Sequence, residues 1–145
     1  MKIVIGSDHG GYKLKEEIKA HLKRRKIGFR DLGAYSEEPV DYPDIGKKAA
    51  KAVALKKYKF GILFCGTGLG MAMVANKIKG IRAAVCHNIY TAKMSRAHND
   101  ANILSLGGRV LKKAMAYKIV DTFLKTPFDG GRHLRRVRKI GEPHP

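Results

Sequence analysis

The sequence predicts an α/β fold in which helices cover both faces of a five-stranded parallel sheet, giving a three-layer α/β/α sandwich. Five short apolar runs alternate with longer segments whose apolar residues recur at helical spacing. Strands that each lead into a helix are typical of a parallel sheet buried on both sides. The 145 residues contain no linker or repeat, so we expect a single domain over residues 1–145.

The predicted elements alternate along the chain. A β-branched run comes first, and the helix after it carries Leu14, Ile18 and Leu22 on one face. A short second strand ends before a glycine, and Pro43 occupies the first turn of the second helix, where proline is well tolerated. A wholly apolar central strand, two further strands, three helices and a basic terminal segment follow. The predicted strands are residues 2–7, 28–32, 60–65, 81–86 and 102–106. The predicted helices are residues 12–25, 43–57, 69–78, 90–98 and 110–124, with a short helix in residues 130–140.

The chain is strongly basic, with a net charge of +18 from 30 Lys and Arg against 12 Asp and Glu. Such a charge suits a polyanion, and a basic nucleic-acid-binding domain is therefore one interpretation. The lysines, however, are spread over helix faces rather than gathered with aromatic residues. A small anionic substrate such as a sugar phosphate fits the charge equally well, and we expect that partner rather than a nucleic acid.

The sequence gives no sign of export or membrane insertion. No apolar stretch reaches the roughly 18–20 residues of a membrane span, and the N-terminus leads directly into a strand pattern rather than a signal peptide. The two cysteines, Cys65 and Cys86, do not make a disulfide framework. We therefore expect a cytoplasmic protein without membrane contacts.

The most informative motif is a cysteine at the end of the central strand, followed by alternating glycines: Cys-Gly-Thr-Gly-Leu-Gly at residues 65–70. A thiol at such a turn lies where backbone N–H groups converge, which favours the thiolate. No Asp or Glu occurs between Ile45 and Asn99, so Cys65 is the only local candidate for an acid–base group. Cys86 leads into no glycine turn and is expected to be a buried apolar residue.

Missing residues exclude three other kinds of glycine-rich site. A dinucleotide fingerprint has its third glycine one residue later and an acidic residue about 20 positions further on. A P-loop continues with Gly-Lys-Ser/Thr, and a cysteine phosphatase loop has an arginine where Met71 stands. Two interpretations remain: a plain tight turn, or a nest of N–H groups that holds an oxyanion or enediolate.

Two polar pairs are further candidates for the site. Asp8-His9 follows the first strand and can share proton transfer, although Asp8 also suits the N-cap of the next helix. His98-Asn99 ends a helix before the last strand, where a histidine is often only a structural charge. Because ligands bind outside the carboxyl ends of parallel strands, we expect both pairs on the same edge of the sheet as Cys65.

Several arginines suit a phosphate group. Arg109 follows two glycines, and Arg132 and Arg136 are four residues apart, so they share one face of a helix. Guanidinium groups arranged in this way bind a phosphate monoester, although a solvated basic tail is the alternative. We expect no metal site, because the histidines lack paired spacing and the central third of the chain has no carboxylates.

Taken together, these residues resemble the family of ribose-5-phosphate isomerase type B, which also contains the galactose-6-phosphate isomerase subunits. The resemblance covers nearly the whole chain and rests on motifs at residues 6–9, 40–43, 65–68, 75–77, 80–83, 95–100 and 130–133. It implies a Rossmann-like sheet and an aldose–ketose isomerase without a cofactor. The implied reaction interconverts ribose 5-phosphate and ribulose 5-phosphate, a step of the pentose phosphate pathway.

The resemblance also implies the roles of individual residues. Cys65 would move a proton between C1 and C2 of the sugar, while Thr67 and the N–H groups of residues 66–70 stabilise the enediolate. His98 would open the furanose ring with help from Asp8. His9 and the three arginines would hold the phosphate, some of them from a second subunit. The implied substrate-binding residues are Asp8, His9, Tyr42, Gly66, Thr67, Gly68, Leu69, Gly70, Asn99, Arg109, Arg132 and Arg136.

By the same resemblance the protein would be a homodimer or homotetramer with its sites at the dimer interface. Residues 126–145 would pack on a partner subunit. Met71 stands where some members carry a glutamate base, so the chain resembles the cysteine subgroup. Two alternatives to the pentose reaction stay open: isomerisation of a hexose 6-phosphate such as allose or galactose 6-phosphate, and a cysteine hydrolase that uses Cys65, His98 and Asp8.

Overall fold

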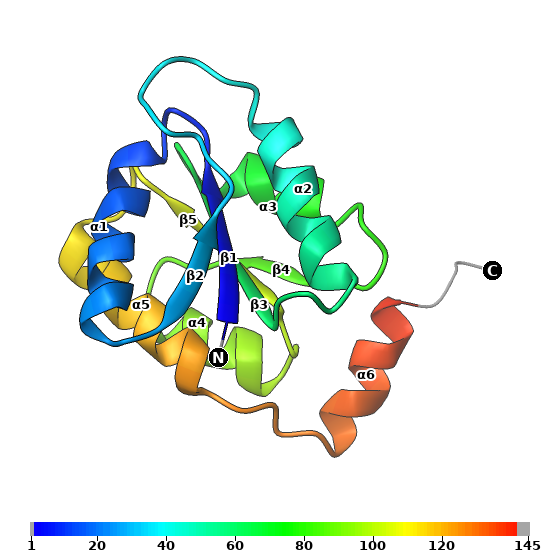
Figure 1. The fold of residues 1–145 in the computed structure, drawn as a ribbon. Coiled ribbons are helices and arrows are strands. Elements are labelled where there is room, and N and C mark those ends of the chain that lie inside the picture. The colour runs from blue at the N-terminus through cyan, green and yellow to red at the C-terminus, as the bar shows by residue number, and fades with distance from the viewer. Residues whose placement is uncertain (1, 142–145) are drawn as a thin grey trace.

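A computed structural model describes residues 2–141 as a five-stranded parallel sheet between two layers of helices, which confirms the predicted sandwich (Figure 1). The strand order is β2-β1-β3-β5-β4. The strands are β1 (Lys2–Ser7), β2 (Gly28–Asp31), β3 (Phe60–Cys65), β4 (Ala83–Val85) and β5 (Ile103–Gly107). The helices are α1 (Tyr12–Arg24), α2 (Tyr42–Ala54), α3 (Leu69–Ala75), α4 (Ile89–Ala97), α5 (Lys113–Lys125) and α6 (Arg132–Ile140).

Side chains of the central strands alternate between two apolar cores, one on each face of the sheet. Ile3 and Ile5 of β1 pack in the core that contains residues of α1 and α5, whereas Val4 packs in the core that contains residues of α2 and α3. The same alternation places Cys65 in the second core, together with Met71. The thiol is therefore held on the α2–α3 side of the sheet at the end of β3.

Some element bounds differ from those predicted. The helix predicted from residue 110 begins at Lys113, because the chain first turns after β5: the N–H groups of Val110 and Leu111 both donate to the carbonyl oxygen of Gly107. The helix predicted over residues 69–78 ends at Ala75 and continues as turns. The strand β4 lies at the edge of the sheet and is shorter than predicted, with three residues.

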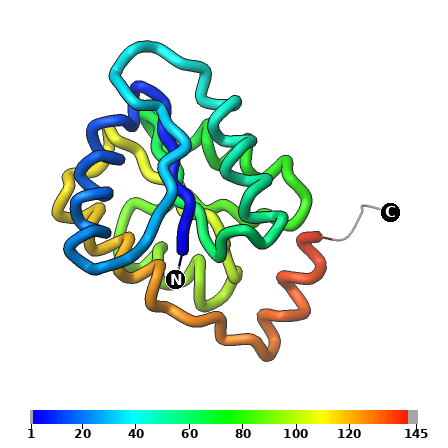
Figure 2. Tube along the Cα trace, in the orientation of Figure 1, coloured from blue at the N-terminus to red at the C-terminus, as the bar shows by residue number. Residues whose placement is uncertain are grey.

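The direction of each helix decides which edge of the sheet its end reaches. In a parallel sheet, the helix between two strands must return the chain to the amino edge. The end of α4 therefore lies at the amino edge, just before β5 begins. Figures 1 and 2 show α6 beyond the same edge, where the N-terminus lies, and apart from the three layers. Within residues 2–141, none of the helices is both long and apolar enough to cross a membrane.

Candidate active site

Cys65 lies where three segments are joined by main-chain hydrogen bonds beyond the ends of their strands. The N–H of Gly108 donates to the carbonyl oxygen of Cys65 at 2.8 Å, and the N–H of Arg109 donates to that of Gly66 at 2.9 Å. The N–H of Asp8 donates to the carbonyl oxygen of Phe64, the residue before Cys65, at 3.1 Å. This rigid frame brings Asp8, Cys65 and Arg109 together at the carboxyl edge.

The glycine loop directs a hydrogen-bond donor at the sulfur. Gly68 has φ of 83°, a left-handed conformation that strains other residues. Its N–H lies 3.1 Å from the Cys65 Sγ, and its carbonyl oxygen accepts a hydrogen bond from Ser105 Oγ at 2.6 Å. A donor directed at the sulfur stabilises negative charge on it, as a thiolate base requires.

A hollow of about 300 Å³ opens in front of the thiol. Tyr42 forms one wall and lies so close to the loop that a Cβ on Gly70 would be 2.5 Å from its ring. The lining residues are Asp8, Tyr42, Cys65, Gly66, Thr67, Gly70 and Arg109. All seven are among the predicted site residues.

An adjoining hollow of about 270 Å³ shares Arg109 with the first and contains His9. The His9 Nδ1 accepts the N–H of Val40 at 3.2 Å, so the Nε2 is free to donate. This hollow also contains Lys13 and Glu37, which were not predicted as site residues. Lys13 resembles the other helix lysines in sequence, and Glu37 lies in a loop without a motif, so only the tertiary structure identifies them.

Asp8 combines two positions that the sequence left as alternatives, one at the start of a helix and one in the site. Its Oδ1 accepts the N–H of Gly11 at 3.0 Å, and Gly11 is the residue that precedes the first turn of α1. The carboxylate thus stabilises the turn into the helix. It also lines the hollow beside Cys65, with only 8% of the residue exposed.

The prediction that His98 and Asn99 share an edge with Cys65 within one subunit is wrong. Both residues follow α4 and precede β5, so they lie at the amino edge. Cys65 pairs with Gly107 at the other end of β5, which is roughly 13 Å long at 3.3 Å per residue. The rule about carboxyl ends applies to loops that follow strands, and this loop follows a helix.

A second cluster of predicted site residues surrounds His98 at the amino edge. The His98 ring stacks on that of His133, with centroids 4.1 Å apart and planes 11° from parallel. The His98 Nε2 lies 4.0 Å from the Asp129 Oδ2. Arg132 and Arg136 follow on α6, where the predicted helix is confirmed. No role was predicted for His133 or Asp129 from the sequence, although His133 directly follows Arg132.

The charge around this second cluster suits an anion better than a cation. The ligand atoms of His98, Asp129 and His133 lie within 4.8 Å of one another, so these side chains could approach a metal ion. Desolvation, and then the charges of His98, Arg132 and Arg136, lower the pKa of His133 below its ordinary value. The positive charges of Arg132 and Arg136 oppose the binding of a cation and favour that of a phosphate group.

The fold and the two clusters define an α/β protein that can hold a small anion beside a thiol at the carboxyl edge of its sheet. The family model described as Ribose/Galactose Isomerase matches residues 3–140. The chain belongs to this family, which confirms the predicted membership and the predicted class of enzyme.

Relatives match over almost the whole chain. Ribose-5-phosphate isomerase B of Escherichia coli is 48% identical over 139 residues, covering 96% of this chain and 93% of that protein. The solved structure of ribose-5-phosphate isomerase B from Clostridium thermocellum is 59% identical, with a TM-score of 0.96, covering 97% of this chain and 95% of that one. The enzyme of Mycoplasma genitalium with bound ribulose-5-phosphate is 44% identical, with a TM-score of 0.92 and coverages of 97% and 93%.

Proposed function

We propose that the protein is an aldose–ketose isomerase that interconverts ribose 5-phosphate and ribulose 5-phosphate. The observation that carries this proposal is the pair of adjoining hollows, with a thiol in one and His9 in the other, joined by Arg109. The arrangement suits a substrate with a reacting end and a phosphate end. The ribulose-5-phosphate bound to the Mycoplasma genitalium relative supports this choice of substrate.

Cys65 is the proposed carrier of the proton. As a thiolate it removes the C2 proton of the open-chain aldehyde, so the C–H electron pair forms a C1–C2 double bond and O1 becomes negative. The Cys65 thiol then returns the proton to C1, while the proton of O2 passes to O1 and O2 becomes the ketone oxygen. A positioned base contributes about 10²–10⁴-fold to the rate.

The loop after Cys65 is the proposed site of charge stabilisation. Donors placed where an oxyanion forms contribute about 3–4 kcal/mol each. Gly66, Thr67 and Gly70 of this loop line the hollow in which the enediolate would form, and their N–H groups and the Thr67 hydroxyl are the proposed donors. These donors therefore lower the barrier further than the base alone does.

The phosphate is proposed to bind in the hollow around His9. The His9 Nε2 and the Arg109 guanidinium offer donors there; the His9 ring is held by the Val40 N–H, and the backbone of Arg109 is held by Gly66. The phosphate does not react, so its binding energy orients the sugar against Cys65.

We further propose that a second copy of this chain completes each site with His98, Asn99, Arg132 and Arg136. In one subunit these residues lie at the edge opposite Cys65. A two-fold dimer can bring the amino-edge cluster of each copy against the carboxyl-edge hollow of the other. Each copy would then be a single domain whose segment 126–145 packs on its partner; residues 142–145 lie outside the described part of the chain.

The separate position of α6 supports this arrangement. The helix stands apart from the three layers (Figure 1). It exposes two apolar residues, Leu134 at 38% and Ile140 at 62%. Exposed apolar groups on a projecting helix are stabilised by a partner that covers them.

A substrate panel tests the proposed reaction. The enzyme is assayed with ribose 5-phosphate, allose 6-phosphate and galactose 6-phosphate under one condition, and its binding to an RNA oligonucleotide is measured in parallel. We expect kcat/KM to be at least about tenfold higher for the pentose, since one mispositioned carbon costs about 1–3 kcal/mol. Preference for a hexose phosphate would reassign the substrate, and salt-sensitive RNA binding without turnover would overturn the proposal.

A further inference from the structure

The turn that carries His98 and Asn99 is held by an arginine from another segment. The Arg82 Nε donates to the carbonyl oxygens of Asn99 at 3.1 Å and Asp100 at 3.0 Å, and its Nη2 donates to the latter at 2.9 Å. The N–H of Arg82 in turn donates to the Asn102 Oδ1 at 2.8 Å. The Arg82 guanidinium and the Asn102 side-chain amide thus fix the backbone on both sides of Asp100.

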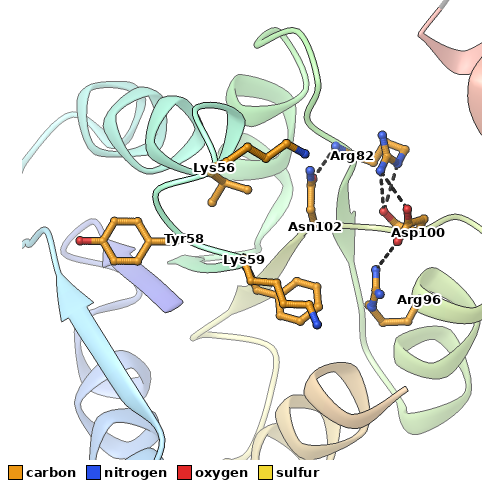
Figure 3. Close-up of a pocket in the computed structure, with 9 residues that line it drawn as sticks. Lys56, Tyr58, Lys59, Arg82, Arg96, Asp100 and Asn102 are labelled. Atoms are coloured by element: carbon orange, nitrogen blue, oxygen red, sulfur yellow. Dashed lines mark hydrogen bonds and ion pairs between the residues drawn. The ribbon is translucent and has the colours of Figure 1, made fainter. Parts of the chain in front are cut away.

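A second arginine holds the same turn from α4. The Arg96 Nη1 donates to the Asp100 Oδ1 at 2.8 Å and to the carbonyl oxygen of Ala101 at 2.6 Å. Figure 3 shows the Asp100 carboxylate between the two guanidinium groups. The Arg96 guanidinium is also stacked 4.7 Å from the centroid of Phe60, and only 6% of the residue is exposed. Its place is therefore closely defined.

The conformation of Asp100 shows why the turn needs these contacts. Its φ of 47° is left-handed, a conformation that a residue with a side chain adopts only at a cost in free energy. The hydrogen bonds from Arg82 and Arg96 offset this cost. Without them the turn would relax, and His98, two residues earlier, would move with it.

Arg96 also joins this turn to the segment that leads into α6. Its Nε donates to the carbonyl oxygen of Thr126 at 3.3 Å, at the end of α5. Beside it, the N–H of Asp129 donates to the carbonyl oxygen of Ala97 at 2.9 Å. The two segments that carry His98 and His133 are thus fixed to each other.

We propose that Arg82 and Arg96 are positioning residues for the part of the active site that each copy supplies to its partner. The proposal rests on the proposed function, and on the ring-opening role that the family resemblance implies for His98. Neither arginine is proposed to contact substrate. Each acts through the backbone of residues 99–101, which sets where the His98 imidazole lies. A small displacement of a reacting group costs up to about 10²-fold in rate.

Two rate measurements, of which only one needs ring opening, distinguish a positioning role of the arginines from a general loss of stability. Ribose 5-phosphate is mostly a closed furanose, so its conversion needs ring opening and proton transfer. Ribulose 5-phosphate cannot form a furanose, because its O5 is esterified. Exchange of its C1 proton with D₂O, followed by NMR, therefore reports proton transfer at Cys65 without ring opening.

The variants are Arg82→Met and Arg96→Lys, with Arg25→Met as the matched control. Arg25 also pairs with a carboxylate, Asp121, at 2.8 Å, but it lies away from the turn. We expect both test variants to convert saturating ribose 5-phosphate about 10–100-fold more slowly, while C1 exchange stays within about threefold of the unmodified enzyme. The control keeps both rates.

Equal losses in both rates, or no loss in either, would overturn the proposal. A thermal melt of each variant shows the folded fraction, and rates are expressed per folded enzyme. If Arg96→Lys does not fold, Arg82→Met decides the matter, since the Arg82 side chain is 26% exposed beside an open cavity of about 290 Å³. Failure of the unmodified enzyme in both assays would instead refute the isomerase function.

Discussion

At the scale of single residues, the two cysteines show how position decides chemistry. Both are buried free thiols. Cys65 receives the Gly68 N–H and faces a hollow. Cys86 follows β4 inside the core, where burial raises the pKa of its thiol despite hydrogen bonds with Ser95 and Thr91. Cys86 therefore stays protonated at neutral pH and suits packing, as the sequence predicted.

This contrast gives a matched pair of variants. Cys65→Ser replaces the proposed base with a much weaker acid while nearly preserving its size. We expect kcat to fall by about 10²–10⁴-fold with little change in KM, because a positioned base contributes that much to rate. Cys86→Ser should keep its kcat within a few-fold of the unmodified enzyme. Steady-state kinetics with ribose 5-phosphate measure both, and an active Cys65→Ser enzyme would remove the thiol from the mechanism.

At the scale of elements, a buried ion pair connects α1 to β2 and to the loop after it. Lys15 is fully buried, and its Nζ donates to the Asp31 carboxylate at 2.8 and 2.9 Å and to the Ala34 carbonyl oxygen. The N–H of Ala34 then donates to the carbonyl oxygen of Ser7 at 2.6 Å. The pair therefore supports the end of β1, where Asp8 and His9 begin.

The charges of this pair perturb each other. Burial lowers the pKa of Lys15, although Asp31 partly offsets that effect. Burial also opposes ionisation of Asp31, but hydrogen bonds from Lys15, the Gly33 N–H and Lys19 outweigh it and hold the Asp31 pKa below its ordinary 3.8. Ionised Asp31 thus stabilises the fold at pH values above 3.8. This contribution is lost as the pH falls through the lower pKa that Asp31 has in the folded protein.

Lys15→Met tests this support. It leaves Asp31 without its main partner, so the free energy of unfolding should fall by about 3–5 kcal/mol at neutral pH. The folded-state pKa of Asp31 should rise toward its ordinary 3.8, so the share of the acid destabilisation that comes from Asp31 should shrink in the variant. Urea unfolding over a pH series measures both effects.

Lys13→Met is the control for this variant. The Lys13–Glu37 pair is exposed and 3.9 Å long, and such pairs contribute about 0–1 kcal/mol. Equal losses in the two variants would contradict the role assigned to Lys15.

The elements also show what sequence patterns can predict. Apolar runs located all five strands, and the Cys-Gly loop located the hollow, because both depend on neighbouring residues. The stacking of His98 on His133 and the contacts of Arg82 with Asp100 join residues distant in sequence, so no local pattern predicts them. The wrong prediction for His98 has another cause. His98 lies after a helix and before a strand, and this order already implied the amino edge of the sheet.

At the scale of the whole molecule, the two proposed halves of the site lie at opposite edges of the sheet in one copy. The carboxyl edge holds the thiol, the glycine loop and Arg109. The amino edge holds the paired histidines and the arginines of α6. The net charge of +18 gives the molecule a positive field, which draws phosphorylated substrates toward it. Two copies are the smallest assembly that would unite the two proposed halves.

Mixing two inactive variants tests this central claim most directly. Cys65→Ser and His98→Asn are mixed in equal amounts, their subunits are allowed to exchange, and ribose 5-phosphate isomerisation is measured. If sites are shared, each mixed dimer has one intact site, with Cys65 from one copy and His98 from the other. Half of the dimers are mixed, so activity should rise to about a quarter of the unmodified level.

Mixing Cys65→Ser with Thr67→Ala is the control for the complementation measurement. Both changes lie in the same half of the site, so this mixture should show no gain. If the first mixture also stays at the average of its two parents after subunits have exchanged, Cys65 and His98 do not act from different copies, and the shared site is contradicted.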